Sequence, residues 1–286
     1  MKFRKILRRL WRRKPHPISS LPPEIISRIF IHCLPSLGSA PSRSHAPLLT
    51  AQICGSWRAI ALQTPQLWVN ISLSCDVKSP VEILKLWSLR AGSLPLNYLL
   101  ITTDAERGRL LIEAAIPHHQ RWGLLFFRLP SASYVGMHTL ADASFPALHS
   151  LWLDIPRHDA SGALLSTGTP DSSNKLVEIR DAPKLRNVDI SSSPTFFAFP
   201  QHLLEIPWEQ LETLNVAIEN DKWVDSVSTL VLCTRLMELT FSSVPETPIP
   251  VEITSRVTMT FLRCLDLGKN PYDSQLLDHL SCVGFR

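Results

Sequence analysis

Residues 21–30 read Leu21-Pro22-Pro23-Glu24-Ile25-Ile26-Ser27-Arg28-Ile29-Phe30, and this stretch has the features of a helix start. Prolines fit the first turn of a helix, where backbone N–H groups have no partner, and Glu24 favours the positive end of the helix dipole. Apolar residues then recur at helical spacing in two adjacent rows, Ile25 with Ile29 and Ile26 with Phe30. Pro35 ends the pattern, so we predict a short amphipathic helix before it.

A second helical segment is predicted from Leu48 to Pro65, and it contains the run Ile53-Cys54-Gly55-Ser56-Trp57. Its apolar residues share one side of a helix: Leu49, Ile53, Trp57, Ile60 and Ala61. Two short helices with wide apolar faces cannot bury a large core alone. We therefore expect them to pack against each other and against a partner.

These two segments resemble an F-box, and most closely the F-box-like proteins that are numerous in mushroom-forming fungi. The first half of the family pattern is matched at Leu21, Pro22, Glu24, Ile25, Ile26, Ile29 and Phe30. The second half is matched at Ile53, Cys54, Trp57, Ile60, Ala61, Pro65, Leu67 and Trp68. Gly55 departs from the pattern, since a basic residue is usual there and glycine weakens a helix interior by about 1 kcal/mol relative to alanine. The connection from Pro35 to Pro47 is also long.

The resemblance implies that residues 18–73 bind a Skp-family adaptor and, through it, a cullin-based ubiquitin ligase. The implied adaptor-binding residues are Leu21, Pro22, Glu24, Ile25, Ile29, Phe30, Ile53, Cys54 and Trp57. The ordinary alternative is a buried helical hairpin without such a partner.

The first 17 residues are a basic tail and linker. Eight Lys and Arg residues and no acidic residue lie within the first 14 positions, and Phe3, Ile6, Leu7, Leu10 and Trp11 fall at helical spacing. Four interpretations stay open: a nuclear address, a surface for acidic lipid, a mitochondrial transit peptide and a disordered basic tail.

After residue 73 the chain repeats the pattern Leu-x-x-Leu-x-Leu. Its first positions are Leu148, Leu185, Leu211, Leu236 and Leu262, separated by 37, 26, 25 and 26 residues. Counting back by 26 adds Trp122 and Leu96. This period falls in the leucine-rich-repeat range of about 20–29 residues. The long interval contains the Ser- and Gly-rich run 157–174, which we interpret as an insertion.

Helices are predicted between these strand patterns at Val81–Ala91, Trp223–Cys233 and Gln275–Val283. A strand followed by a helix in each repeat builds a curved solenoid. We therefore predict an α/β chain in three parts: a basic amphipathic tail and linker (1–17), a small all-helical F-box-like domain (18–73), and a curved leucine-rich-repeat-like solenoid with a parallel sheet (74–286).

Alternation along each strand sends the leucines into the core and the residues between them to the concave face. The target-binding residues predicted on that face are Trp152, Asp154, Asn187, Asp189, Asn215, Glu238, Thr240 and Asp266. Its acidic residues share one surface, so we expect the target to be basic. In the earlier repeats the same places hold Tyr98, Leu100, Leu124 and Phe126, which either bind a partner or are covered by the neighbouring linker.

Motifs for catalysis are missing from the sequence. It has no Gly-rich phosphate loop, His-Glu-x-x-His, Gly-x-Ser-x-Gly or dinucleotide fingerprint. We therefore expect no enzyme activity, no cofactor, no metal and no specific nucleic-acid partner. The adjacent pair His118-His119 fits a polar loop better than a metal site, because neighbouring residues face different ways.

Six cysteines without a Cys-x-x-Cys pair favour reduced thiols, and hence the cytoplasm or nucleus. No apolar run reaches the length of about 18 residues that a membrane span needs.

Two function classes remain. In the first, the chain is the substrate-recognition subunit of a cullin-type (SCF) ubiquitin ligase, and its repeats hold an unknown target protein. In the second, it is a scaffold without a ligase, localised through the basic amphipathic N-terminus. Co-purification with a Skp-family adaptor separates the two classes.

Overall fold

The computed structural model describes residues 17–154, 177–190, 204–217, 229–243, 257–266 and 280–282. The chain divides into two compact units. Unit 1 comprises Met1–Ser36 and Ser42–Trp68, and unit 2 comprises Leu37–Pro41 and Val69–Arg286. The predicted basic tail up to position 16 and the predicted insertion at 157–174 lie outside the described residues.

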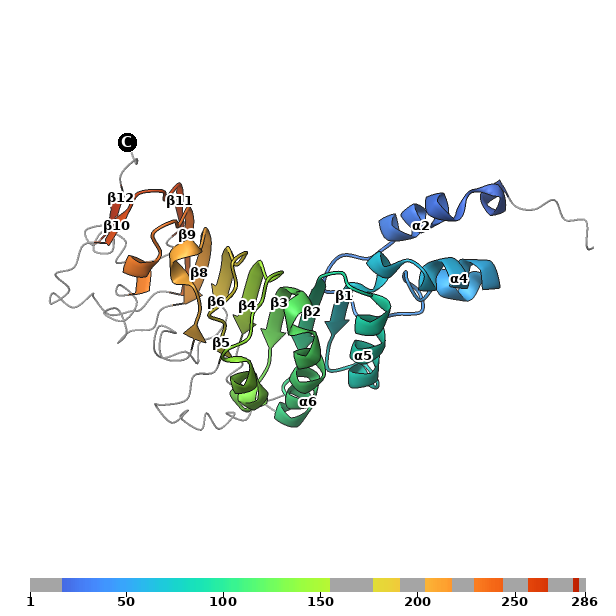
Figure 1. Ribbon diagram of the computed structural model, residues 1–286, viewed down its shortest axis with the longest axis horizontal. Helices are drawn as coiled ribbons and strands as arrows, with labels where there is room; N and C mark the ends of the chain where they lie inside the picture. The colour runs from blue at the N-terminus through green and yellow to red at the C-terminus, as the bar shows by residue number, and fades with distance from the viewer. Residues whose placement is uncertain are drawn as a thin grey trace, which may run out of the picture. The chain divides into compact units, whose positions relative to one another are not determined.

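The described part of unit 1 is helical (Figure 1). Its elements are η1 (Pro17–Ser20), α2 (Pro23–His32), α3 (Thr50–Ile53), α4 (Gly55–Leu62) and η2 (Pro65–Trp68). Helix α2 begins where the sequence predicts, with Pro22 at the N-cap and Glu24 in the first turn. Proline at this point gives up only an N–H that has no helical partner.

Cys54 divides the second helical segment, which we had predicted as one helix from Leu48. Its backbone is extended, with φ −158° and ψ 171°, between α3 and α4. Gly55 therefore begins α4, and the penalty expected for an interior glycine does not arise. The prediction of a continuous helix was wrong because apolar spacing does not reveal a one-residue break.

The core of unit 1 is small and partly aromatic. The rings of Phe30 and Trp57 lie 4.9 Å apart between centroids. The indole Nε1 of Trp68 donates to the carbonyl oxygen of Ala61 at 3.0 Å. The buried apolar side chains at the matched positions are Ile26, Phe30, Ala61, Leu67 and Trp68. These residues hold the helices together and leave other apolar positions on the surface.

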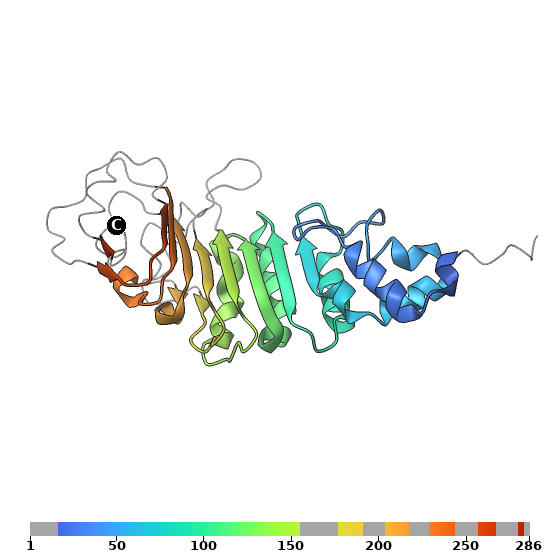
Figure 2. The same cartoon turned by 90° about the horizontal axis from the view of Figure 1, so that it is seen from above.

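Unit 2 contains one eight-stranded sheet whose neighbouring strands are all parallel (Figure 2). In spatial order the strands are β1 (Asn70–Leu73), β2 (Leu96–Ile101), β3 (Trp122–Arg128), β4 (Ser150–Asp154), β6 (Asn187–Ile190), β8 (Thr213–Ala217), β9 (Glu238–Ser243) and β11 (Cys264–Asp266). The predicted α/β class with a parallel sheet is confirmed. Strand β1 lies within the stretch 18–73 that the sequence assigned to the helical part.

Three rows of apolar side chains cross the strands and form the core under the sheet. The first row consists of Leu96, Trp122, Leu148, Leu185, Leu211, Leu236 and Leu262. The second consists of Ile71, Tyr98, Leu125, Leu151, Val188, Leu214 and Leu239, and the third of Leu73, Leu100, Phe127, Leu153, Ile190, Val216 and Phe241. The repeated apolar pattern from Leu148 to Phe241 is thus confirmed as the core side of the strands.

The register of β2 differs from the predicted one. Tyr98 pairs with Leu125, and Leu100 pairs with Phe127. The side chains of Tyr98 and Leu100 therefore lie in the core and not on the predicted concave face. Their prediction as surface residues was wrong because the pairing shifts by one residue at Gly123, a β-bulge. Counting back by 26 residues missed this extra residue, and a one-residue slip exchanges the two faces of a strand.

Helical elements cover one face of the first strands (Figures 1 and 2). They are α5 (Pro80–Arg90), α6 (Ala105–Ala115), η3 (Ile116–Arg121) and η4 (Ser131–Leu140). Helix α5 confirms the predicted helix at Val81–Ala91. Helix α6 was not predicted, although Asp104 caps it by accepting a hydrogen bond from the N–H of Arg107 at 3.0 Å.

Shorter elements follow on the later connections. They are β5 (Val177–Glu178), β7 (Leu204–Glu205), η6 (Trp208–Gln210), β10 (Val257–Met259) and β12 (Leu280–Cys282). Strands β5 and β7 form one parallel pair, and β10 and β12 form another. The helix predicted at Gln275–Val283 is wrong at its described residues because 280–282 form β12. Of the helix predicted at Trp223–Cys233, the described residues 229–232 are helical.

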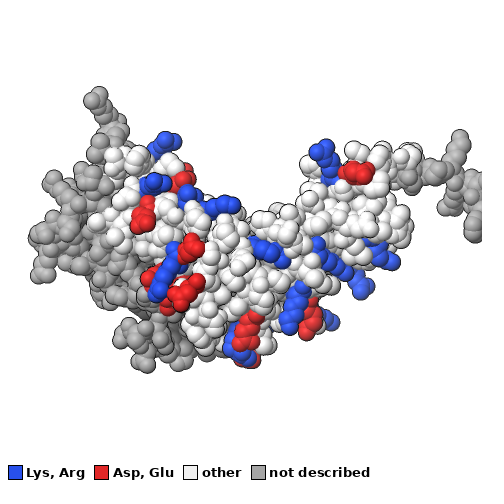
Figure 3. Space-filling model, viewed as in Figure 1, with Lys and Arg blue, Asp and Glu red and all other residues white. Residues whose placement is uncertain are grey.

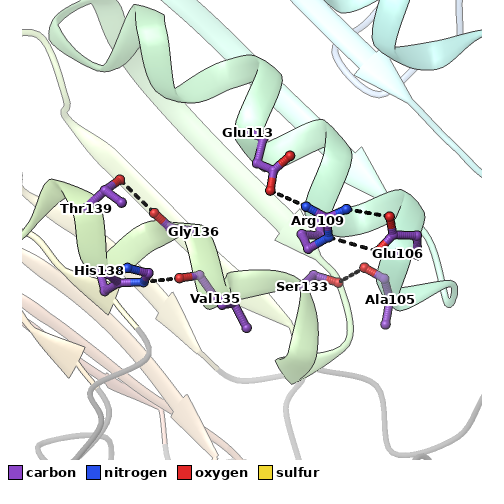
Figure 4. A network of polar contacts seen from close by, with 9 residues as sticks. All are labelled: Ala105, Glu106, Arg109, Glu113, Ser133, Val135, Gly136, His138 and Thr139. Atoms are coloured by element: carbon purple, nitrogen blue, oxygen red, sulfur yellow. Dashed lines mark hydrogen bonds and ion pairs between the residues drawn. The ribbon is translucent and has the colours of Figure 1, made fainter.

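Helices α6 and η4 lie side by side (Figure 4). They pack closely at Gly108. The hydroxyl of Ser133 donates to the carbonyl oxygen of Ala105 at 3.1 Å. A Cβ added at Gly108 would lie 2.8 Å from the Cβ of Ser133, so this contact requires glycine. On the outer face of α6, Arg109 bridges Glu106 and Glu113.

Leu37–Pro41, which we call the strap, belongs to unit 2 although the chain on both sides of it belongs to unit 1. The N–H of Gly38 donates to Oγ of Ser72 on β1 at 3.3 Å. Gly38 has φ +102°, and a Cβ there would lie 3.9 Å from Cδ2 of Leu99 on β2. We call the face of the sheet that the helical elements do not cover the open face. The strap therefore lies beside the open face at its β1–β2 end.

Candidate functional site

Unit 1 exposes Leu62 at the end of α4 and two pairs of large apolar side chains earlier in the chain. Leu21 lies just before α2 and is 36% exposed, and Ile25 lies in the first turn of α2 and is 42% exposed. Leu49 and Ile53 lie at and within α3 and are 42% and 54% exposed. Leu49 and Ile53 are four residues apart at α3, which places them on the same side of that helix, whereas Leu21 lies before the N-cap of α2. We call these four residues the exposed apolar set of unit 1.

The other predicted adaptor-binding residues differ in their exposure. Pro22, Glu24 and Cys54 are exposed, and Ile29 and Trp57 are half-buried. Phe30 is 1% exposed, so it cannot contact a partner directly. Its place is in the core against Trp57, where it supports the surface instead of forming it.

Cys54 carries an exposed thiol at the N-cap of α4. Its sulfur lies 3.1 Å from Oγ of Ser56 at the start of α4. A hydrogen bond from the Ser56 hydroxyl lowers the pKa of the Cys54 thiol, and a bond from the N–H of Trp57 lowers it further. Donors at a helix N-terminus favour the thiolate in this way. By contrast, burial raises the pKa of Cys233 to about 12.

The open face of the unit 2 sheet presents side chains in two lateral rows. One row is Ser72, Leu99, Phe126, Trp152, Asp189, Asn215, Thr240 and Asp266. The second row is Asn70, Asn97, Leu124, Ser150, Asn187, Thr213, Glu238 and Cys264. The structure thus brings seven of the eight predicted target-binding residues onto one face in these rows.

The row that contains Trp152 is apolar on β2, β3 and β4. Phe126 and Trp152 meet edge to face, with ring centroids 5.6 Å apart. Trp152 is 39% exposed, which is high for a tryptophan in a central strand. Leu99 and Ile101 lie on the same face, where the shifted register of β2 places them. Sequence counting missed both of these residues.

The later part of the open face is polar and joined by lateral hydrogen bonds. Nδ2 of Asn187 donates to Oγ of Ser150 at 3.2 Å, and Nδ2 of Asn215 donates to Oδ2 of Asp189 at 3.1 Å. Glu238 and Asp266 are exposed. These contacts order the side chains before any partner arrives.

Asp154 does not occupy the exposed position that we predicted. Its side chain is 8% exposed, and its Oδ2 lies 3.2 Å from Nε of Arg128 on β3. Burial raises the pKa of the nearby Tyr134 phenol, and the charge of Asp154 raises it further. A buried and paired carboxylate cannot meet a target, so Asp154 is a structural residue.

The described ranges contain no candidate metal site. Among those residues, no three His, Cys, Asp or Glu side chains could hold a metal ion. His118 and His119 lie in η3, where burial lowers the pKa of His118 and the His119 ring packs on Phe145. None of the helices in the described part of the chain is long and apolar enough to cross a membrane. On the face drawn in Figure 3, basic and acidic side chains are interspersed.

Comparisons with protein-family models, with curated proteins and with solved structures find no match for this chain.

Proposed function

We propose that this chain is the substrate-recognition subunit of a cullin-type (SCF) ubiquitin ligase in the cytoplasm or nucleus. Unit 1 acts as an F-box-like domain that docks a Skp-family adaptor. Unit 2 acts as a leucine-rich-repeat-like solenoid that holds a target protein on the open face of its sheet.

The exposed apolar set of unit 1 is the observation that carries the proposal. Leu21, Ile25 and Ile53 occupy positions of the F-box-like pattern and remain on the surface, whereas Phe30 and Trp68 of the same pattern are buried. The pattern therefore divides into residues that hold the helices together and residues that are left for a partner. Removing apolar area from water yields about 25 cal/mol per Å², so a partner that covers this set gains affinity.

The proposed mechanism requires no bond chemistry from this chain. A subunit that holds a target near a ubiquitin-loaded partner raises the effective concentration of the target for transfer. It needs one surface for the ligase and a separate surface for the target. The two candidate surfaces lie on different units of the chain.

Adaptor capture tests the proposal. The full chain should co-purify with a Skp-family adaptor, and Leu21→Ala with Pro22→Ala should weaken capture at least about tenfold, since burying a large apolar side chain contributes about 1.5–3 kcal/mol. Leu89→Ala is the control, because Leu89 is a 75% exposed leucine of unit 2. Undiminished capture by the double variant would refute the docking surface. Absence of capture by the unaltered chain would favour the scaffold alternative.

A further inference from the structure

The aromatic pair on the open face is placed to receive a side chain from another molecule. The strap lies beside the β1–β2 end of the row that contains this pair, because the N–H of Gly38 donates to Ser72 and Gly38 lies near Leu99. Phe126 and Trp152 come next along the row, and Trp152 keeps 39% of its surface in water. An exposed tryptophan backed by a half-buried phenylalanine is the type of anchor point that dominates protein interfaces.

The charge of the open face changes beyond Trp152. Among the described open-face positions of β6, β8, β9 and β11 there are three acidic residues, Asp189, Glu238 and Asp266, and no basic residue. The one basic open-face residue on β3 and β4 is Arg128, which pairs with Asp154. A surface with this charge favours a basic partner and speeds its capture.

The sheet also determines how a partner can bind. In the eight-stranded sheet, β2, β3, β4, β6, β8 and β9 are hydrogen-bonded to neighbours on both sides, so they cannot accept an added strand. A partner must therefore contact side chains, and it must cross the strands to reach both the aromatic pair and the acids. Neighbouring strands lie about 4.8 Å apart, and an extended chain advances about 3.3 Å per residue.

We propose that the open face of unit 2 binds an extended segment of a partner protein with one apolar anchor residue and basic residues at set distances after it. Asp189 and Asp266 lie in the row of Trp152, one and four strands beyond it, and Glu238 lies three strands beyond it in the neighbouring row. These offsets correspond to about 5, 14 and 19 Å, or to about two, four and six residues of an extended segment. The basic residues thus stand about two, four and six positions after the anchor. The inference rests on the proposed function only in making that partner the ligase target.

Peptide binding to the purified full chain tests the inference. The probe is a fluorescent nine-residue peptide that begins with leucine, carries lysine at its third, fifth and seventh positions, and has glycine or serine elsewhere. Fluorescence anisotropy should show binding that weakens as salt rises, because salt screens exposed charges over about 8–10 Å. Peptides with the leucine replaced by serine, or with all the lysines replaced by glutamate, should bind at least about tenfold more weakly.

Protein variants locate the binding to the open face. Trp152→Ala should reduce affinity at least about tenfold. Asp189→Lys with Glu238→Lys should reduce both the affinity and its salt dependence. The matched controls are Leu89→Ala and Glu82→Lys, two exposed residues of α5 outside the open face. Both controls should bind as the unaltered chain does.

Equal binding of the lysine and glutamate peptides, or full binding by a folded Trp152→Ala variant, would overturn the inference. If a protein variant does not fold, the affinities of the three peptides for the unaltered chain decide the outcome. Binding that appears only after residues 1–14 are deleted would overturn the assignment to a partner, in favour of the chain's own basic segment. Adaptor capture is measured separately with unit 1 variants, so a failure here is distinct from a failure of the ligase proposal.

Discussion

Oγ of Ser88 on α5 lies 2.9 Å from the phenolic oxygen of Tyr98 on β2, and both side chains are fully buried. This hydrogen bond joins the first helix of unit 2 to the second strand of the sheet. Burial raises the pKa of Tyr98 to about 12, against a partial opposing effect of the Ser88 hydrogen bond. The core of unit 2 therefore contains a phenol that resists ionisation.

Alkaline pH should weaken unit 2 through Tyr98. The folded-state pKa is raised from 10.0 to about 12, so the stabilising effect is complete below pH 10 and is lost as the pH rises toward 12. Two pKa units correspond to about 3 kcal/mol. Urea unfolding at pH 8, 10 and 11.5 should show the decline, and Tyr98→Phe should show less of it. An equal decline in both proteins would contradict the assignment.

Gly108→Ala should destabilise unit 2 even though alanine favours helices. The added Cβ would lie 2.8 Å from the Cβ of Ser133, so α6 and η4 must move apart. Overpacking of this kind typically costs about 1–3 kcal/mol, more than the roughly 1 kcal/mol that alanine gains in helix propensity. Thermal unfolding measured by circular dichroism provides the check.

Gly55→Ala is the matched control for this substitution. Gly55 also lies in a helix, α4, but a Cβ there meets nothing within 4 Å. We expect its melting temperature to stay the same or to rise slightly. Equal losses in the two variants would mean that helix packing at Gly108 is not the cause.

Much of the fold could be predicted because the apolar pattern and the backbone pattern agree. Leucines at alternate positions from Leu148 to Phe241 can all be buried together in one register only, and that register is the one found. The start of α2 was equally clear, since Pro22 and Pro23 tolerate few other places in a helix.

The sequence-based predictions were wrong where a single residue alters the backbone or the burial of a side chain and the apolar pattern stays the same. A bulge at Gly123 exchanged the faces of β2 and brought Tyr98 into the core. An extended Cys54 broke a pattern that still has helical spacing. Asp154 was assigned to the exposed concave face by alternation along its strand, but pairing with Arg128 permits its burial.

Arg128→Met should destabilise the chain more than Arg109→Met. Arg128 pairs with a carboxylate that is 8% exposed, so its removal leaves a nearly buried charge, and a loss of about 1–3 kcal/mol is expected. Arg109 bridges Glu106 and Glu113 on the exposed side of α6, where ion pairs contribute little (Figure 4). Chemical denaturation of the two variants gives the comparison, and equal losses would show that burial of Asp154 is not what matters.

Cys54 should be alkylated by iodoacetamide faster than Cys233 at neutral pH. The Ser56 hydroxyl and the N–H of Trp57 lower the pKa of Cys54, which increases its thiolate fraction, whereas burial raises the pKa of Cys233 to about 12. The thiolate is the reactive form, so Ser56→Ala should slow the alkylation of Cys54. Mass spectrometry after timed labelling measures both sites, and an unchanged Cys54 rate in Ser56→Ala would exclude the hydroxyl as the cause.

A bound Skp-family adaptor should protect Cys54 from the same reagent. Cys54 follows Ile53, which is 54% exposed, and precedes the half-buried Trp57, so a partner that covers this stretch also covers the sulfur. Cys75 is exposed in unit 2 and is the internal control, because its labelling should not change on adaptor binding. If the complex forms and Cys54 is still labelled at the rate of the free chain, the adaptor does not cover the start of α4, and the docking surface must be sought at Leu21 and Ile25 alone.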